Sequence, residues 1–273
     1  MIELPEAATL ARQMQQTLVG RTISTADIAG DRPKFLFIPD DFAKRLVGRA
    51  ISSVATKGKW IFSTLDNGEI LTLGEFGGRF QYHEPDADLP KKRHATLGLK
   101  DGGSLTLAIQ MWGFLCVLSA EELAAHPYAG TLGPSPIDED FTPARWNEVL
   151  DGYLETENKP VKAFLTHEAN VCGIGNGYLQ DILFRAHLSP KRKVSSLGAD
   201  DRASLYHAMR DTLEEAFDLE GRDTERTLFG EPGGYTPLLD KRSKDQPCTR
   251  CGTPIAKMQY LGGSCYVCST CQT

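Results

Sequence analysis

The chain has 273 residues and a formal net charge of −6, with 41% hydrophobic and 24% charged residues. This composition is typical of globular proteins and excludes collagen, coiled coils and bulk disorder. No stretch approaches the roughly 20 apolar residues of a membrane span, and the N-terminus lacks the features of a signal peptide. By itself, the acidic balance argues against nucleic-acid binding, for which a basic domain is usual.

The first twenty residues predict a capped helix. Pro5 suits a first helical turn, and Glu3 and Glu6 favour the positive end of the helix dipole. Apolar side chains then recur every four residues until Gly20, which ends the pattern.

From about residue 21 to residue 118 the pattern predicts β-strands. The turn sequences at 66–68 and 101–103 each separate two apolar runs and predict tight hairpins. A Pro- and Gly-rich segment, 131–143, follows as a linker or packed connection. After it, the pattern predicts helices over 144–153, 159–167, 177–186 and 199–218.

Cysteine usage indicates a cytosolic protein. Cys116 and Cys172 lie alone in apolar sequence and are interpreted as small buried hydrophobic residues. The other five of the seven cysteines lie near the C-terminus. Without an export signal, a disulfide framework is not expected.

The C-terminal cysteines form the strongest local motif. Two Cys-x2-Cys pairs, separated by sixteen residues, match a structural Zn²⁺ site of four thiolates. The predicted ligands are Cys248, Cys251, Cys268 and Cys271. The segment between the pairs predicts a hairpin that turns near Gly262 and Gly263, and Cys265 is interpreted as a bystander. A redox pair would require a βαβ unit, which the pattern does not contain. Such zinc hairpins also bind protein partners, so the motif alone does not identify a function.

A glycine-rich turn at 173–177 precedes one of the predicted helices. Backbone N–H groups at such a turn can bind a phosphate, and the Asn176 side chain can add hydrogen bonds. A dinucleotide site is excluded because no strand precedes the turn. The helix is followed by a small basic patch, 189–193. This patch either contributes to anion binding or is simply a solvent-exposed helix end.

The order of these motifs resembles the formamidopyrimidine-DNA glycosylase / endonuclease VIII family over essentially the whole chain. Each motif is weak alone, but their order and spacing are specific. The matching positions are Glu3–Glu6, Lys59, 131–134, Lys162, 173–178, Ser189–Pro190, 195–197 and the cysteine hairpin.

The resemblance implies an α+β multidomain fold. Residues 1–130 would form an N-terminal β-sandwich with flanking helices, and 131–228 a helix–two-turns–helix DNA-binding domain. Residues 229–273 would hold a lid-like loop and a zinc-finger β-hairpin. The implied partner is double-stranded DNA with a damaged base or an abasic site, bound by a cytoplasmic, nucleoid-associated monomer without membrane contact.

Family members extrude a damaged base and attack the sugar with an N-terminal amine, usually of a proline exposed by removal of Met1. A terminal amine suits this role because its ordinary pKa is far below that of lysine. By resemblance, Glu3 would transfer protons at the sugar, and Glu6 would position the terminus. Lys59 would contact phosphate or assist proton transfer.

This chain has Ile2 where the family has proline, and a bulky second residue predicts that Met1 is retained. Three alternatives follow. The protein is a glycosylase that attacks with the amine of Met1 or of a trimmed Ile2. It is a hydrolytic glycosylase, with Glu3 activating water and little lyase activity. Or it binds damaged or distorted DNA without cleaving it. A fourth reading, from the hairpin alone, is a zinc protein recruited to other partners.

Other positions depart from the family where side chains fill the gap left by the flipped base. Glu75 stands where methionine is common, and its charge would repel phosphates. Gln110 and Trp112 stand where arginine and phenylalanine are common, and Trp112 can still stack as a wedge.

The phosphate contacts are altered as well. Gly263 stands where the family hairpin carries an arginine that reaches the lesion phosphate. We therefore expect the contacts to phosphate near the lesion to come mainly from Lys59, Lys162 and Asn176. The loop at 230–239 does not match the family closely, so the sequence does not name the lesion.

The acidic charge is concentrated in two segments. Residues 101–150 carry seven acidic and one basic residue, and 201–225 carry eight and three. The remaining segments, which by resemblance would line the DNA, are neutral to basic. The distribution permits DNA binding but predicts weaker non-specific affinity than a basic relative would show.

Overall fold

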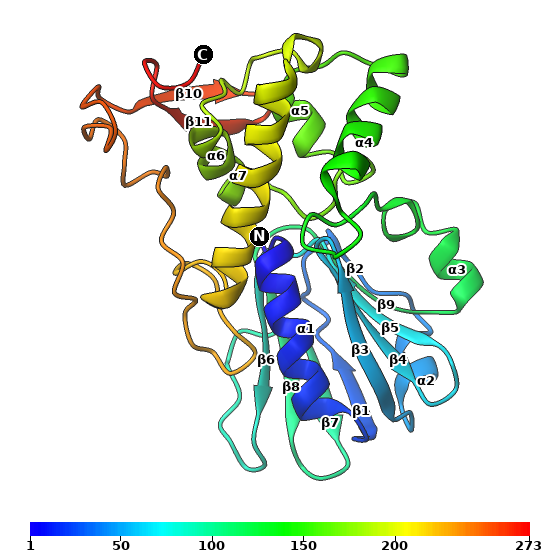
Figure 1. The fold of residues 1–273 in the computed structure, drawn as a ribbon. Coiled ribbons are helices and arrows are strands. Elements are labelled where there is room, and N and C mark those ends of the chain that lie inside the picture. Colours follow the sequence, from blue (N-terminus) through cyan, green and yellow to red (C-terminus); the bar gives the residue numbers. More distant parts are fainter. The chain divides into compact units, whose positions relative to one another are not determined.

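The computed structural model describes residues 1–273 and divides into two compact units (Figure 1). Unit 1 comprises Met1–Thr131 and Phe217–Tyr235, and unit 2 comprises Leu132–Ala216 and Thr236–Thr273. The boundaries at 130 and 228 stay sequence-based proposals. By contacts, 217–235 groups with the N-terminal unit, to whose first helix it is hydrogen-bonded, and the cysteine hairpin groups with the helices of unit 2.

Unit 1 contains two mainly antiparallel sheets. The four-stranded sheet has the order β1 (Ile23–Ile28), β7 (Ala95–Leu99), β8 (Ser104–Ile109), β6 (Gly78–His83). The five-stranded sheet has the order β2 (Leu36–Phe37), β9 (Gly113–Leu118), β5 (Ile70–Gly74), β4 (Trp60–Leu65), β3 (Ile51–Lys57). Both predicted hairpins, β4–β5 and β7–β8, are confirmed.

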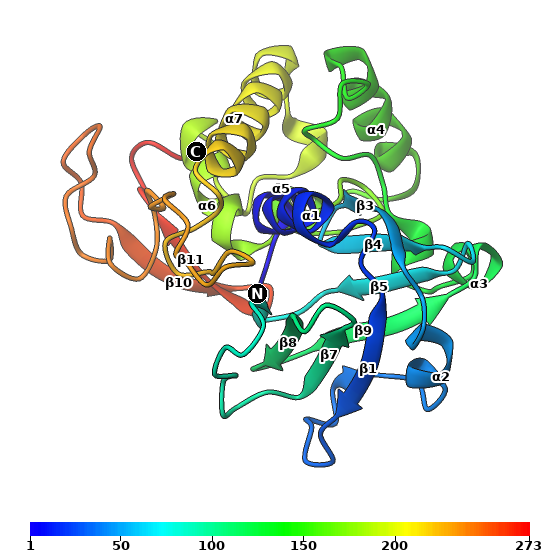
Figure 2. The ribbon, with the colours of Figure 1, turned by 90° about the horizontal axis from the view of Figure 1, so that it is seen from below.

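The helices of unit 1 are α1 (Leu4–Leu18), α2 (Phe42–Leu46), α3 (Ala120–Ala124) and the 3₁₀ turn η1 (Ala129–Thr131). The helix predicted in the first twenty residues is confirmed as α1, which packs against β3 and β4 (Figure 2). Apolar side chains of α1 and of both sheets form one buried core. This core fixes the start of the chain, since Ile2 belongs to it.

Unit 2 contains the four helices that the pattern predicts. They are α4 (Pro143–Thr156), α5 (Val161–Leu165), α6 (Asn176–Arg185) and α7 (Ala199–Asp218), whose last two residues belong to unit 1. The 3₁₀ turn η2 (Val194–Ser196) lies between α6 and α7. The C-terminal hairpin pairs β10 (Ala256–Tyr260) with β11 (Gly263–Val267), as predicted.

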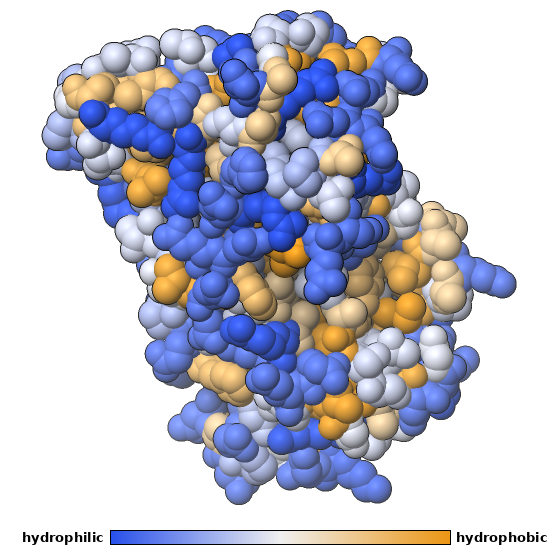
Figure 3. Space-filling view, in the orientation of Figure 1, coloured by the Kyte–Doolittle hydropathy of each residue, from blue (hydrophilic) through white to orange (hydrophobic).

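Most of the drawn surface is hydrophilic (Figure 3), and the two isolated cysteines are buried as predicted. Figure 3 shows hydrophilic residues over most of the drawn face, with hydrophobic side chains gathered over the five-stranded sheet beside α3. None of the helices combines the length and hydropathy needed to cross a bilayer. Cys116 and Cys172 are buried, and burial raises the pKa of the Cys116 thiol to about 11, so this thiol is neutral at pH 7.

A buried carboxylate ties the segment after residue 236 to α6. Asp181 is 0% exposed and accepts hydrogen bonds from the backbone N–H groups of Leu238 and Leu239, both at 2.9 Å. We expect Asp181→Ala to lower the free energy of unfolding by about 3 kcal/mol, because it leaves buried donors unpaired. Urea denaturation measures this loss. Asp211→Ala, on an exposed position of α7, serves as the control and should change stability by less than about 0.5 kcal/mol. Equal stability of the two variants would contradict the expectation.

Candidate active site at the N-terminus and candidate metal centre

Hydrogen bonds to the backbone fix the first three residues. The Ile2 N–H donates to the Phe76 carbonyl at 3.0 Å. The Glu3 N–H donates to Oε2 of Glu6 at 2.8 Å, and the Met1 carbonyl accepts from Nη2 of Arg222 at 2.8 Å. The Ile2 side chain is 2% exposed and lies in the core. The chain is therefore anchored through Ile2, and only Met1 projects from it.

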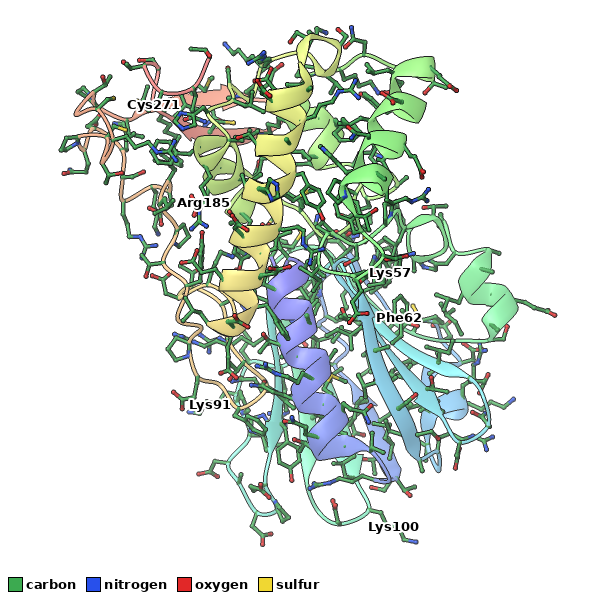
Figure 4. All side chains as sticks on the ribbon, viewed as in Figure 1. Lys57, Phe62, Lys91, Lys100, Arg185 and Cys271 are labelled. Carbon is green, nitrogen blue, oxygen red and sulfur yellow. The ribbon has the colours of Figure 1, made fainter.

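The Met1 amine lies beside a small cavity of unit 1. Met1 is 41% exposed, and its ammonium nitrogen lies 3.3 Å from Oε1 of Glu225. The cavity has a volume of about 160 Å³ and is lined by Met1, Gly77, Gly78, Arg79, Gln110, Met111, Thr224, Glu225 and Arg226. The N-terminus lies at the end of the sandwich where β3 ends at Lys57, away from the β7–β8 turn with Lys100 (Figure 4).

Two buried carboxylates and one guanidinium lie directly behind the terminus. Glu3 and Glu6 are buried, and Arg222 binds Glu6 Oε1 through both its backbone N–H and its Nε, each at 3.0 Å. Arg222 Nη1 lies 3.4 Å from Glu3 Oε1. Sequence reasoning did not single out Arg222, since no local motif marks it. Its position more than 200 residues after Glu6 gives no sequence signal of the contact.

The loop after β5 brings Glu75 and Lys59 close to the start of the chain. The Glu75 N–H donates to the Lys59 carbonyl at 3.4 Å, and the next residue, Phe76, accepts the Ile2 N–H. Lys59 is buried, and Glu75 adopts a positive φ of 51°. The structure therefore groups Met1, Glu3, Glu6, Lys59 and Glu75, whose roles in the reaction and in DNA binding stay predictions.

Gln110, which stands where the family commonly has arginine, lines the cavity at Met1. Trp112 is partly exposed and packs against Phe37, with ring centroids 4.8 Å apart, and against Phe114 at 5.7 Å. Trp112 thus belongs to an aromatic cluster of unit 1. Stacking of Trp112 on DNA bases stays a prediction.

In unit 2, Lys162 and Asn176 meet the turn of the cysteine hairpin. Lys162 is 2% exposed, and its Nζ donates to the Tyr260 carbonyl at 2.8 Å and to Cys265 Sγ at 3.3 Å. Cys265, the cysteine outside the four-cysteine motif, therefore contacts Lys162, a residue predicted to bind DNA phosphate. That Lys162 and Asn176 bind DNA phosphate stays a prediction.

The residue at the hairpin turn lies against the Asn176 side chain. A Cβ atom at Gly263 would lie 2.3 Å from Asn176 Nδ2 and 3.5 Å from Lys162 Nζ. An arginine at this position would displace Asn176, so glycine and the present arrangement of Lys162 and Asn176 occur together.

The four predicted zinc ligands converge in unit 2. Their Sγ atoms all lie within 4.8 Å of one another, with 3.9 Å between Cys248 and Cys271 and 3.4 Å between Cys251 and Cys268. Four thiolates around one zinc ion at about 2.3 Å would lie about 3.8 Å apart. The donor set and spacing therefore fit a tetrahedral metal site, with Cys271 near the chain end (Figure 4).

Two family models match the chain. Residues 1–110 match the formamidopyrimidine-DNA glycosylase N-terminal domain, and residues 132–227 match the formamidopyrimidine-DNA glycosylase H2TH domain. The chain belongs to the formamidopyrimidine-DNA glycosylase family. The family predicted from the sequence is thus confirmed.

Similar proteins cover the whole chain. Formamidopyrimidine-DNA glycosylases of Bacillus cereus and Bacillus subtilis are 31% and 30% identical to it, covering 100% of this chain and 99% of their own. The crystal structure of the MutM (Fpg) protein of Thermus thermophilus has a TM-score of 0.86 and 28% identity, covering 99% of this chain and 98% of its own. The Lactococcus lactis Fpg, solved with DNA containing an abasic site, shares the fold at a TM-score of 0.86, with 24% identity and 99% coverage of each chain.

These similarities confirm two further predictions. The α+β fold, with N-terminal sheets, a helix–two-turns–helix domain and a C-terminal cysteine hairpin, is confirmed. The enzyme class, a base-excision DNA glycosylase, is confirmed as well. The alternative of a catalytically impaired member is not favoured, and neither is a zinc protein of unrelated function.

Proposed function

We propose that this glycosylase releases a damaged base from double-stranded DNA by attack of the primary amine of Met1 on the sugar. The observation that carries the proposal is the anchoring of residue 2. The Ile2 nitrogen is bonded to the Phe76 carbonyl and its side chain is in the core, whereas Met1 lines a cavity and its amine pairs with Glu225, which lines the same cavity. If Met1 is retained, its primary amine can therefore take the role of nucleophile that the N-terminal proline has in the family.

The reaction follows from the chemistry of a primary amine. The Met1 nitrogen attacks C1′ of the damaged nucleotide, the bond from C1′ to the base breaks, and the base leaves with a proton. The nitrogen then loses a proton, and its lone pair opens the sugar ring by breaking the bond from C1′ to O4′, which takes up a proton, so that an imine forms. Removal of a proton from C2′ then expels the 3′-phosphate and cleaves the strand. Glu3 transfers protons at the sugar, because its carboxylate lies directly behind the terminus.

We also propose a role in DNA binding for each of the predicted contact residues. Lys59 binds phosphate near the lesion, and Lys162 and Asn176 do so from unit 2. Gln110 and Trp112 enter the gap left by the extruded base, whereas Glu75 keeps phosphates away from its loop. The named relatives suggest formamidopyrimidines, ring-opened purines, as the first lesions to test. The enzyme acts as a monomer in the cytoplasm, associated with the nucleoid.

The cysteine site holds a structural Zn²⁺ through Cys248, Cys251, Cys268 and Cys271. The support is the donor set and its spacing. Zinc here would stabilise the hairpin and take no part in the chemistry, because four thiolates leave no open coordination position.

A single-turnover assay of base release from a duplex that contains one formamidopyrimidine tests the proposed function. We expect Glu3→Gln to lower the rate by about 100- to 10,000-fold, since it removes proton transfer. Glu121→Gln, on the exposed surface of α3, is the matched control and should keep the wild-type rate. The proposal fails if wild type releases no base from a panel of oxidised, alkylated and crosslinked lesions. It also fails if Glu3→Gln retains full activity.

A further inference from the structure

Arg222 is a buried residue that neither the family motifs nor the proposed chemistry uses. It is 8% exposed, and its side chain reaches several oxygens at the start of the chain. Nη2 lies 2.8 Å from the Met1 carbonyl and 3.6 Å from Oε1 of Glu225, and Nε lies 3.0 Å from Oε1 of Glu6. The guanidinium therefore contacts the first residue of the chain and three carboxylates around it, those of Glu3, Glu6 and Glu225.

We infer that Arg222 is a positioning residue that, together with Glu225, holds the Met1 amine at the reacting position. This inference rests on the proposed function, in which Met1 is the nucleophile. The nitrogen of a terminal proline is held within a ring, whereas the amine of Met1 can rotate about the bonds of an acyclic residue. A displacement of about 1 Å in a reacting atom can cost roughly 100-fold in rate.

Arg222 fixes the peptide group from which the amine projects. Its hydrogen bond to the Met1 carbonyl, with the Ile2 N–H bound to Phe76, fixes the peptide plane between residues 1 and 2. A guanidinium presents several donors in a planar fork, so one side chain can bind a carbonyl and carboxylates together. Lysine would supply a charge but not this geometry.

Glu225 restrains the nitrogen itself. Its Oε1 lies 3.3 Å from the Met1 ammonium and 3.6 Å from Arg222 Nη2, so Arg222 orients the carboxylate as well as the carbonyl. The amine must lose a proton before it attacks, and the neighbouring carboxylate is the acceptor that the geometry offers. The proton passes from the Met1 nitrogen to Glu225 Oε1, which leaves a neutral nucleophile.

The segment that carries both residues is fixed to the N-terminal unit. The Leu228 N–H donates to Gln13 Oε1 at 2.9 Å, and the Arg12 guanidinium lies 4.8 Å from the centre of the Phe217 ring. Gly221 has a φ of 91°, and a Cβ there would lie 2.8 Å from Cγ of Glu6. Glycine therefore permits the close approach that brings the next residue, Arg222, onto Glu6. Both groups are held in place before DNA binds.

The test is the single-turnover rate of borohydride trapping on an abasic-site duplex, measured beside affinity for a duplex with a tetrahydrofuran abasic analogue. We expect Glu225→Gln to lower the trapping rate about 10-fold or more and Arg222→Met about 100-fold. Affinity for the analogue should change by less than about twofold. General unfolding would instead lower both the trapping rate and the affinity. Arg222→Lys should recover only part of the loss.

Glu220→Gln is the matched control on the same segment, because Glu220 bonds Arg12 and Gln13 and not the terminus. It should trap at the wild-type rate. Glu225→Gln keeps the bonds between Arg222 and Glu6, so it tests the inference even if Arg222→Met fails to fold. If wild type forms the adduct and Glu225→Gln traps at the same rate, the positioning role is overturned but the proposed nucleophile is not. Failure of wild type to form any adduct at residue 1 would overturn the proposed nucleophile, and the positioning role with it.

Discussion

Adding one residue before Met1 should abolish the covalent adduct with abasic-site DNA. The added residue converts the Met1 nitrogen into an amide, which is not nucleophilic, and moves the new amine by up to about 3.5 Å. Because a misplacement of about 1 Å already costs roughly 100-fold, we expect a loss of more than 100-fold in the trapping rate. The extended chain also places a peptide where the Met1 ammonium pairs with Glu225. The measurement is borohydride trapping followed by peptide mass spectrometry to locate the adduct.

The control is a chain extended by one residue after Thr273, which should trap like wild type. An adduct at an internal lysine in both proteins would contradict the assignment of Met1. Base release without any adduct in wild type would instead support hydrolysis activated by Glu3. Mass spectrometry of the intact protein shows in the same experiment whether Met1 is retained, which separates attack by Met1 from attack by a trimmed Ile2.

Loss of one zinc ligand should unfold the C-terminal hairpin. An isolated two-stranded hairpin is at most marginally stable, and the buried residues around this one form a small cluster. Structural zinc contributes about 10–16 kcal/mol of binding free energy in zinc-finger peptides. We therefore expect Cys268→Ser to lose zinc and to lose amide protection from hydrogen exchange in β10 and β11, while the strands of unit 1 stay protected. Elemental analysis and hydrogen exchange measure the two effects.

Cys265→Ala is the matched control for this prediction. Cys265 lies on the same hairpin but outside the four-cysteine cluster, so the variant should keep one zinc per chain. A wild-type protein that holds no zinc would contradict the metal assignment. Equal zinc in Cys268→Ser and wild type would show that the ligand set is wrong.

The features predicted correctly from the sequence depend on neighbouring residues. Helix α1 follows from Pro5, the glutamates around it and the apolar period, and the β4–β5 hairpin from its Asp-Asn-Gly turn. Paired Cys-x2-Cys spacing predicted four sulfurs that the fold does bring together. The short helices α2 and α3 were not predicted, whereas α5, which has the same length of five residues, was predicted within 159–167.

The sequence by itself determined the family, the order of elements, the cysteine cluster and the departure at Ile2. Only the tertiary structure decided that Ile2 is anchored in the core while Met1 faces a cavity, and that Lys162 meets Cys265. It also decided that Arg222 lies against Glu6, 216 positions earlier in the chain. The reason is physical. Turns and helices form from interactions within a few residues, whereas a buried ion pair forms when packing brings distant segments together, and no local pattern records which segments will meet.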